Sequence, residues 1–229
     1  MVDYIDWKQP SLWIAIASII FNPLFWNVVA RQEYRNKFLT KLAFGNPRLG
    51  CYALAVTIFS LGILRDHLYQ VALSEQPTHA GLHYTEFKLL AAISFALGAV
   101  LVVSSMWALG VTGTYLGDYF GILMDEKVDS FPFNVTSNPM YYGSTLSFFA
   151  TALWYESPAG LFLTALVFVE YKIALRYEEP FTGEIYAKRE RERAAANGKD
   201  ERQVVAGSSS AIEPSHSATS RRNHSQEEL

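Results

Sequence analysis

The chain has 229 residues, of which 50% are hydrophobic and 14% aromatic, and its formal net charge is −3 at pH 7. A single cysteine, Cys51, excludes an internal disulfide and any cysteine-rich metal site. The five histidines form no ligand-spaced pair on one helix face. Because the basic residues flank apolar segments, they give no sign of a nucleic-acid interface. We therefore expect no metal and no nucleic-acid partner, and we expect Cys51 to be a small apolar side chain in a helix.

Long uncharged runs indicate an all-α, polytopic integral membrane protein. Residues 11–30 are twenty positions without a charge, and residues 89–111 are twenty-three. A helix needs about 20 apolar residues to cross the hydrocarbon core of a bilayer, so both runs are candidate spans. Residues 49–64 form a shorter uncharged run, and residues 131–155 also carry no charge. These runs predict a membrane-embedded helical bundle with four to five hydrophobic segments.

The first segment, residues 11–30, follows an acidic N-terminus that lacks a basic region and a small-residue cleavage site. We therefore expect an uncleaved anchor rather than a signal peptide. Asn22-Pro23 lies at the centre of this segment. Because proline removes a backbone hydrogen bond and clashes with the preceding turn, the segment is either a kinked span or a re-entrant hairpin.

The second and third segments are expected at residues 49–68, ending at Arg65-Asp66, and at residues 89–112. Two arrangements compete for the last hydrophobic region. In the first, residues 143–156 are a loop and residues 158–176 a single span, which gives four segments. In the second, a helix over residues 140–155 turns at Ser157-Pro158-Ala159-Gly160 and the chain returns through residues 159–177, which gives five segments.

Basic residues favour five segments, because cytoplasmic loops next to spans are enriched in lysine and arginine. Five segments place most basic residues on the side of the C-terminus, namely Arg31, Arg35, Lys37, Lys41, Arg48, Lys127, Lys188, Arg189, Arg191 and Arg193. Only Lys8, Arg65 and Lys88 then fall on the opposite side. After Tyr186 the aromatic residues end, and such a stretch cannot bury enough apolar area to offset the entropy of ordering. We expect a membrane domain over residues 1–190 and a disordered, cytosolic tail over residues 191–229.

A glycine-rich stretch, residues 110–121, separates the third segment from the next. Glycines permit close backbone approach and positive φ. Tyr115 and Tyr119 stand four apart, with Asp118 nearby, and on a helix they would share a face. Two aromatic rings and a carboxylate can cradle an ammonium group. An interfacial aromatic belt would also account for the tyrosines, although not for the glycines or the carboxylate, so both interpretations stay open.

Two polar clusters lie close to membrane boundaries. The first is Asn138-Pro139-Met140-Tyr141-Tyr142-Gly143, and the second is Arg176-Tyr177-Glu178-Glu179-Pro180-Phe181 at the end of an apolar run. Adjacent carboxylates at a membrane boundary are costly to desolvate, so a cationic or hydrogen-bonding partner is expected. Together the clusters predict a small-molecule site at the membrane surface, reached by lipid from one side and by water from the other.

Five strings in a consistent order resemble the phospholipid methyltransferase family. They are FNPLFWNVVAR (21–31), GTYLGDYFGIL (113–123), FPFN (131–134), NPMYYGS (138–144) and YEEPFTGEIY (177–186). The segment GCYALAVTIFSLGILRDHLYQVALSEQPT (50–78) further resembles the fungal branch. In that branch a small enzyme performs the last two methylations towards phosphatidylcholine. The resemblance implies S-adenosylmethionine as the methyl donor, a phospholipid substrate taken from the bilayer and a location in the endoplasmic reticulum membrane.

The resemblance also implies a set of cofactor-binding residues. The family's paired glutamates match Glu178 and Glu179, and its Gly-X-Gly motif falls on Ala96-Leu97-Gly98, where the first glycine is missing. On sequence grounds the small residue Ala96 is better explained by helix packing.

Charge and proton chemistry assign roles to the remaining candidates. A carboxylate near the substrate amine can accept its proton, which makes Asp118, Glu178 and Glu179 candidates, with Asp118 and Glu178 taken as the catalytic pair. Glu178 or Glu179 can alternatively bind the donor's amino group or ribose hydroxyls, while Arg176 pairs with the donor's carboxylate. We expect Tyr141 and Tyr142 to line the donor pocket and face its cationic sulfur.

Three other functions agree with part of the sequence. The first is methylation of phosphatidylethanolamine in addition to its methylated forms, because a binding pocket distinguishes only weakly between substrates that differ by one methyl group. The second is carboxyl methylation of prenylated cysteine by a distantly related membrane enzyme, which typically has His-Pro where this chain has Asn138-Pro139. The third is a non-catalytic membrane scaffold, which would bind no donor and would not need glutamates at the membrane boundary.

Overall fold

The computed structural model describes residues 4–125 and 128–210, which contain helices and no strand. The elements are α1 (Pro10–Asn36), α2 (Phe38–Leu42), α3 (Pro47–Glu75), the short 3-10 helix η1 (Ala80–Leu82), α4 (Thr85–Thr114), the 3-10 helix η2 (Gly117–Phe120), α5 (Pro139–Trp154) and α6 (Pro158–Ser210). Contacts divide the chain into two units, Met1–Tyr186 and Ala187–Leu229. The bundle and the site described below belong to the first unit.

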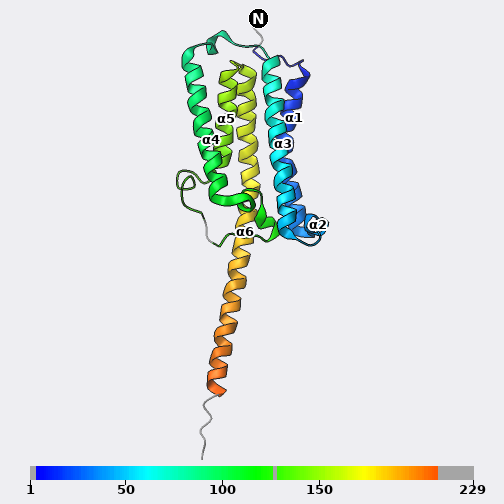
Figure 1. Ribbon diagram of the computed structural model, residues 1–229, viewed down its shortest axis with the longest axis vertical. Helices are drawn as coiled ribbons and strands as arrows, with labels where there is room; N and C mark the ends of the chain where they lie inside the picture. Colours follow the sequence, from blue (N-terminus) through cyan, green and yellow to red (C-terminus); the bar gives the residue numbers. More distant parts are fainter. Residues whose placement is uncertain (1–3, 126–127, 211–229) are drawn as a thin grey trace, which may run out of the picture. The chain divides into compact units, whose positions relative to one another are not determined.

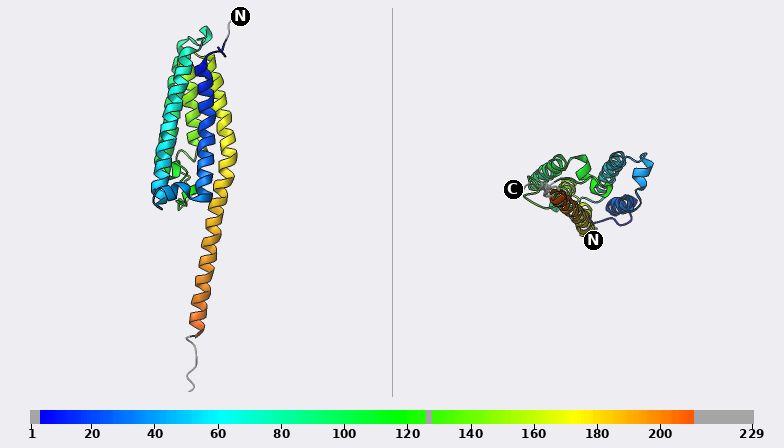
Figure 2. Two further views of the ribbon diagram at one scale, coloured as in Figure 1. Left: turned by 90° about the vertical axis from the view of Figure 1, so that its right-hand side faces the viewer. Right: turned by 90° about the horizontal axis from the view of Figure 1, so that it is seen from below.

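Five helices of the first unit, α1, α3, α4, α5 and the first part of α6, lie side by side (Figures 1 and 2). α1, α4 and α6 run in one direction, and α3 and α5 run in the other. Four stretches are long and apolar enough to cross a membrane: Pro10–Asn36, Pro47–Glu75, Thr85–Phe120 and Pro158–Ala195. The predicted all-α, polytopic bundle is confirmed. α5, with 16 residues, is a helix where the four-segment arrangement has a loop.

The predicted tail, residues 191–229, stays a prediction. α6 continues to Ser210, through a stretch rich in Arg, Glu and Ala, which favour helix over other local conformations. Residues 211–229 lie outside the described residues, as does Lys127 of the predicted cytosolic side.

α1 is one continuous helix, so the first segment is not a re-entrant hairpin. Pro23 lies inside the helix and is buried. The amide of Asn27 donates to the carbonyl oxygen of Pro23 at 3.1 Å, and the amide of Asn22 donates to that of Leu61 on α3 at 3.4 Å. The polar residues around the proline are therefore used inside the bundle.

α3 runs past Arg65-Asp66 to Glu75, ten residues beyond Arg65. The helix therefore does not end at this charged pair, whereas the expected side of the membrane for Arg65 stays a prediction. Arg65 is only 8% exposed. Its guanidinium binds Asp66 and the hydroxyl of Tyr171 on α6. Because the Arg65 charge is paired with Asp66 and Tyr171 inside the bundle, the helix can continue through this position.

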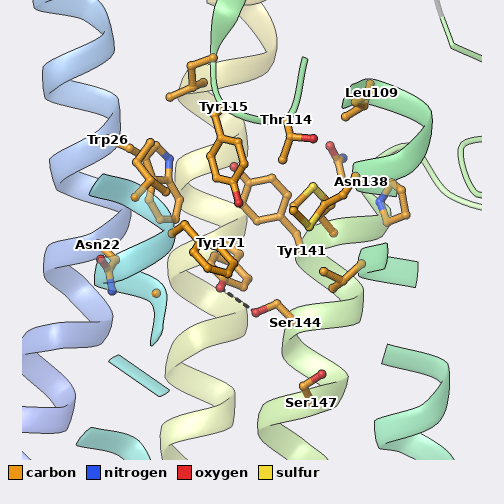
Figure 3. A pocket seen from close by; sticks show the side chains of 18 of the residues that line it. Asn22, Trp26, Leu109, Thr114, Tyr115, Asn138, Tyr141, Ser144, Ser147 and Tyr171 are labelled. Atoms are coloured by element: carbon orange, nitrogen blue, oxygen red, sulfur yellow. Dashed lines mark hydrogen bonds between the residues drawn. The ribbon is translucent and has the colours of Figure 1, made fainter. Parts of the chain in front are cut away.

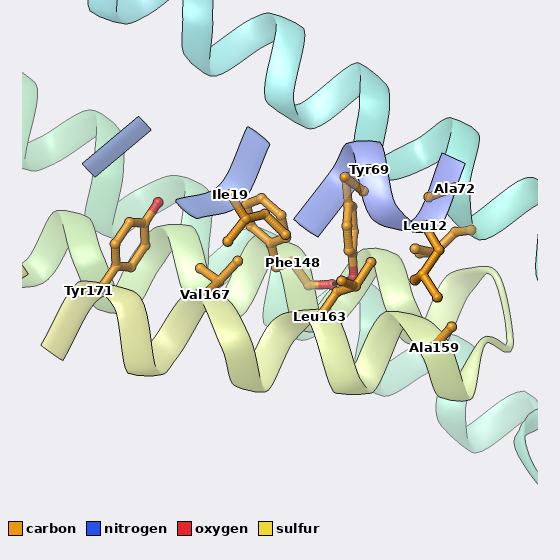
Figure 4. Close-up of a cluster of buried hydrophobic side chains, with 11 residues drawn as sticks. Leu12, Ile19, Tyr69, Ala72, Phe148, Ala159, Leu163, Val167 and Tyr171 are labelled. Atoms are coloured by element: carbon orange, nitrogen blue, oxygen red, sulfur yellow. Dashed lines mark hydrogen bonds between the residues drawn. The ribbon is translucent and has the colours of Figure 1, made fainter. Parts of the chain in front are cut away.

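A cluster of buried apolar side chains joins α1, α3, α5 and α6 (Figure 4). Its members are Leu12, Ala15, Ile19, Tyr69, Ala72, Leu73, Phe148, Ala159, Leu163, Val167 and Tyr171. Tyr69 places its hydroxyl 2.9 Å from the carbonyl oxygen of Phe148 and 3.1 Å from that of Gly160. This polar contact fixes α3 against both α5 and the first turn of α6, since a buried hydroxyl needs a partner.

A second cluster at the other end of the bundle contains Cys51, which is fully buried among Ala30, Leu54, Tyr119 and Phe120. The thiol lies 3.6 Å from the carbonyl oxygen of Tyr115. The position agrees with the expected role of Cys51 as a small apolar side chain.

α4 and α5 pack backbone against backbone at two glycines. A Cβ at Gly98 would lie 2.6 Å from the carbonyl oxygen of Gly143, and a Cβ at Gly143 would lie 2.7 Å from that of Gly98. Small residues allow membrane helices to approach this closely. Gly98, part of the predicted Ala96-Leu97-Gly98 motif, therefore has a packing role in this structure.

An ion-pair cluster closes the end of the bundle at the turn between α5 and α6. The Glu156 carboxylate lies 2.7 Å from Nδ1 of His83 and 2.7 Å from Nζ of Lys88. Hydrogen bonds from His83 and then from Lys88 lower the pKa of Glu156. The ionised carboxylate is therefore the form that this end of the fold favours.

Gly98→Ala is expected to destabilise the bundle by about 1–3 kcal/mol, because the added methyl group must push α4 and α5 apart. The measurement is the midpoint of thermal unfolding in one detergent. Gly62→Ala is the matched control, because a Cβ at Gly62 meets nothing within 4 Å, and alanine is the better helix former. Equal midpoints for the two variants would contradict the close packing at Gly98.

Glu156→Gln is expected to lower the unfolding midpoint at neutral pH. Since the pKa of Glu156 is depressed in the fold, its contribution is present above the unfolded value of about 4.3 and is lost as the pH falls through the lower folded value. The difference between wild type and Glu156→Gln should therefore shrink on acidification below about pH 4. Glu75→Gln, at the exposed end of α3, should show no comparable pH-dependent difference. A constant difference at all pH values would contradict this interpretation.

Candidate active site

A cavity of about 770 Å³ opens between the helices of the first unit (Figure 3). The rings of Trp26, Tyr115, Tyr141 and Tyr171 surround it. Its polar side chains come from all five long helices and the segment after α4, and include Asn22, Arg65, Asp66, Gln70, Thr114, Asp118, Asn138, Ser144, Ser147, Glu178 and Thr182. The predicted small-molecule site therefore has a cavity that can contain it.

Glu178 is the most heavily bonded acid of the cavity. Its Oε1 accepts from Nε1 of Trp26 at 2.7 Å and from Nδ2 of Asn27 at 2.7 Å. Its Oε2 accepts from the hydroxyl of Tyr141. A carboxylate offers about four acceptor positions, so these three donors leave room for about one further donor from a ligand. The three donors also hold Glu178 in one orientation.

Asp118 reaches the cavity because the chain turns sharply after α4. Gly110 has φ 64°, in the left-handed region that glycine adopts without strain, and it interrupts the regular helix. A Cβ at Gly117 would lie 2.6 Å from the carbonyl oxygen of Thr112, so only glycine fits there. Asp118 follows directly and accepts from the hydroxyl of Thr182 on α6 at 2.9 Å.

The expected aromatic cradle is only partly assembled in the cavity. Tyr115 and Asp118 line it. Tyr119 is instead buried and stacks on Phe181, with ring centres 5.1 Å apart. The guanidinium carbon of Arg31 also lies over the ring of Phe181, 4.6 Å from the ring centre. Tyr119 therefore supports the wall rather than facing the ligand space.

The structure brings the two predicted polar clusters together. Tyr141 of α5 bonds to Glu178 of α6, and Nδ2 of Asn138 donates to Oε1 of Glu179 at 2.9 Å. Glu178 faces the cavity, whereas Glu179 is exposed beside it. Adjacent carboxylates at this boundary thus have different partners, which satisfies the expectation that each finds a hydrogen-bonding group.

Several predicted cofactor residues do not line the cavity. Ala96 and Leu97 are exposed on the outside of α4, and Gly98 packs against α5. Tyr142 turns away from Tyr141 and accepts from Nζ of Lys172 at 3.2 Å. Arg176 is exposed on α6. Their donor-binding roles stay predictions.

Sequence reasoning missed the residues that orient the acids. Trp26 and Asn27 lie 152 and 151 positions before Glu178 in the sequence. Both stand inside the quoted string FNPLFWNVVAR, and an indole next to an amide in an apolar run was the available signal. Thr182 had a similar signal in YEEPFTGEIY. Arg65 was missed because it was placed at a helix end.

The cavity fits a polar ligand that carries positive charge. It combines aromatic rings, which attract cations, with the carboxylates of Asp118 and Glu178. Oγ1 of Thr114 is buried with no hydrogen-bond partner among the described residues, so a ligand hydroxyl or amine can satisfy it. Within the described residues, no group of three or more His, Cys, Asp and Glu side chains is placed to hold a metal ion.

Comparisons with known proteins agree with this chemistry. Residues 87–189 match the family model of the phospholipid methyltransferases. A phosphatidyl-N-methylethanolamine N-methyltransferase of Emericella nidulans is 64% identical over 192 residues, which cover 84% of this chain and 93% of that protein. The enzyme of the same name from Saccharomyces cerevisiae is 56% identical, covering 83% of this chain and 92% of its own length.

A mammalian protein is also similar. The phosphatidylethanolamine N-methyltransferase of Mus musculus is 51% identical over 191 residues, covering 82% of this chain and 94% of that protein. No solved structure gives a significant match to the chain. Identity of this extent, over nearly the whole length of the relatives, shows that the chain belongs to the phospholipid methyltransferase family and is an enzyme of that type.

Proposed function

We propose that this enzyme methylates phosphatidyl-N-methylethanolamine and phosphatidyl-N,N-dimethylethanolamine to phosphatidylcholine, with S-adenosylmethionine as methyl donor. Support comes from the names of the fungal relatives at 64% and 56% identity. The observation that carries the proposal is the Glu178 carboxylate, held by Trp26, Asn27 and Tyr141 on the wall of a cavity of about 770 Å³.

The donor site is proposed beside Glu178. When bound, S-adenosylmethionine supplies a methyl group on a cationic sulfur. The remaining acceptor position of Glu178 suits the donor's amino group or a ribose hydroxyl. The ring faces of Trp26 and Tyr141 suit positive charge. Glu179 is proposed to act from outside the cavity, through Asn138 to which it is bonded.

Asp118 is proposed as the general base. The substrate amine is protonated near neutral pH and must lose a proton before its lone pair can form the new N–C bond. Asp118 lines the cavity. Its carboxylate accepts from the hydroxyl of Thr182 and from the backbone N–H groups of Tyr119 and Asp118 itself, which hold it on the wall that a substrate amine can reach. The ring of Tyr115 lines the same wall and can stabilise the ammonium product.

A second candidate is methylation of all three species, starting from phosphatidylethanolamine. The name of the mouse relative, at 51% identity, favours it. Successive substrates differ by one methyl group, which a pocket distinguishes only weakly.

The location is proposed as the endoplasmic reticulum membrane with the C-terminus in the cytosol. Arg31, Arg35, Lys37, Lys41 and Arg48 gather around α2, between α1 and α3. The direction of α6 brings the chain back to that end of the bundle (Figure 1). The enrichment of basic residues on cytoplasmic sides supports this orientation.

Purified protein in lipid–detergent micelles is expected to transfer label from S-adenosylmethionine to the monomethyl and dimethyl lipids. The measurement compares these lipids with phosphatidylethanolamine in separate reactions. Label in all three would establish the second candidate instead. Label in none, beside an active control enzyme, would contradict both.

Glu178→Gln and Glu179→Gln are expected to weaken binding of S-adenosylmethionine by about 10- to 100-fold, the size of a lost charged hydrogen bond. Asp118→Asn should instead lower kcat while donor affinity stays near that of wild type. Calorimetric titration of the donor and steady-state rates separate the two effects. Glu184→Gln, an exposed site on the same helix, is the control. Unchanged donor affinity in Glu178→Gln would contradict the proposed donor site.

A further inference from the structure

Arg65 is a buried cation that the proposed chemistry leaves without a role. It lies inside α3, one of the stretches able to cross a membrane, and lines the cavity. Its side chain is 10% exposed. An ionised side chain at such a position is energetically costly and commonly marks a functional site.

The partners of Arg65 leave part of its hydrogen-bonding capacity free. Nε and Nη2 donate to Oδ1 of Asp66 at 3.1 and 2.9 Å, and Nη1 donates to the hydroxyl of Tyr171 at 2.7 Å. A guanidinium has five N–H groups, so two have no partner among the described residues. The guanidinium carbon lies 4.8 Å from the ring centre of Phe148. The Arg65 guanidinium is thus held in place and still has two N–H groups that a ligand can use.

The counter-ion of Arg65 is less enclosed than Arg65 itself. The Asp66 side chain is 53% exposed, against 10% for Arg65. Both residues line the cavity. A half-exposed carboxylate neutralises a buried guanidinium incompletely, since screening weakens an exposed partner. An anion that enters the cavity would therefore find a cation with both charge and N–H groups available.

The adjoining wall of the cavity is apolar and open at its side. Phe59 and Ile63 of α3 line the cavity and are 54% and 57% exposed. Phe95 and Val103 of α4 also line it and are 56% and 64% exposed. Apolar residues that line a cavity and are exposed on spanning helices offer a surface to acyl chains. A ligand at Arg65 can therefore combine an anionic group with hydrocarbon tails.

A chain of contacts connects Arg65 to the proposed donor site. Arg65 bonds to the hydroxyl of Tyr171, whose ring centre lies 4.9 Å from that of Tyr141. Tyr141 bonds to Glu178. The hydroxyl of Ser144 lies 3.0 Å from that of Tyr171 and adds a polar group on the same wall (Figure 3). Tyr171 and Tyr141 therefore lie between the Arg65 guanidinium and Glu178, beside which the methyl donor is proposed to bind.

We propose that Arg65 binds the phosphodiester of the phospholipid substrate, with the acyl chains leaving between α3 and α4 and the amine reaching towards Glu178 and Asp118. Tyr171 is a positioning residue that orients the guanidinium. This inference rests on the proposed function, because it names the group of the substrate that this part of the cavity recognises.

Lipid binding measured without methyl donor tests the inference. The probes are phosphatidyl-N-methylethanolamine and a phosphate-free analogue in which an ether joins diacylglycerol to N-methylaminoethanol. Each displaces a fluorescent lipid from purified protein in neutral detergent. Wild type is expected to bind the phospholipid about 10- to 100-fold more tightly than the analogue, the size of a charged hydrogen-bonded contact.

Arg65→Gln is expected to lose that preference and to bind both lipids with the affinity of the analogue. Arg65→Lys should restore part of it, since the charge remains but the planar fork does not. Arg48→Gln, an exposed site at the start of the same helix, is the control and should behave as wild type. Affinity for S-adenosylmethionine is expected to change less than affinity for the phospholipid in all variants, because Arg65 reaches the proposed donor site only through Tyr171 and Tyr141.

Equal affinity of wild type for the two lipids would overturn the inference, even if Arg65→Gln fails to fold. A loss in Arg65→Gln that is the same for both lipids would also overturn it, because a merely structural role predicts that result. A phosphate preference in a protein that methylates nothing would contradict only the proposed function. Methylation by wild type together with unchanged phospholipid affinity in Arg65→Gln would contradict only the inference.

Discussion

The carboxylate of Glu178 joins three helices at one point, and the geometry of the candidate active site depends on it. Trp26 and Asn27 bring donors from α1, Tyr141 brings one from α5, and the acid itself belongs to α6. α1 is separated from α5 by about one hundred residues, and the bonded residues of α5 and α6, Tyr141 and Glu178, are 37 positions apart. Because a carboxylate in a largely apolar bundle needs hydrogen-bond donors, the contacts of Glu178 with Trp26, Asn27 and Tyr141 also set the positions of the three helices around the cavity.

The cavity has two chemically different sides, and this division matches a reaction between a water-soluble donor and a lipid. Asp118, Thr182 and Glu178 lie where α4 turns and α6 passes the end of α5. The opposite side is lined along α3 and α4 by apolar residues such as Phe59, Ile63, Phe95 and Val103, and by the polar residues Arg65, Asp66 and Gln70 of α3. In the proposed arrangement both substrates bind in this one cavity, and holding them side by side converts their encounter into an effectively unimolecular step.

The fold could be predicted where it depends on the lengths of the uncharged runs and on the basic residues between them. Uncharged runs of about 20 residues gave the long helices, and the basic residues favoured the arrangement in which residues 140–155 form a helix. The extent of α3 was not predictable, because Arg65 is satisfied by a residue of α6 that lies 106 positions away. Local sequence cannot show such a partner, so a buried charge is easily mistaken for a helix end.

The acids that line the cavity were predicted as site residues from sequence, but their supporting residues were not. Glu178 was singled out as a carboxylate at a membrane boundary and Asp118 as a carboxylate beside two tyrosines, and both line the cavity; their roles stay predictions. The glycine of the Ala96-Leu97-Gly98 motif is required in the structure by close packing on α5. A glycine that is needed for ligand binding and one that is needed for helix packing look alike in a sequence. Only the three-dimensional contacts distinguish the two roles.

The position of the methyl donor is the central claim, and photochemical labelling with radioactive S-adenosylmethionine measures it most directly. After irradiation of the purified protein, the labelled peptides are identified by mass spectrometry. Label on the peptides of α1, α5 and α6 that contain Trp26, Tyr141 and Glu178 is the predicted result. Label confined to the exposed face of α4 around Ala96 and Leu97 would contradict the account, because that face lies outside the cavity.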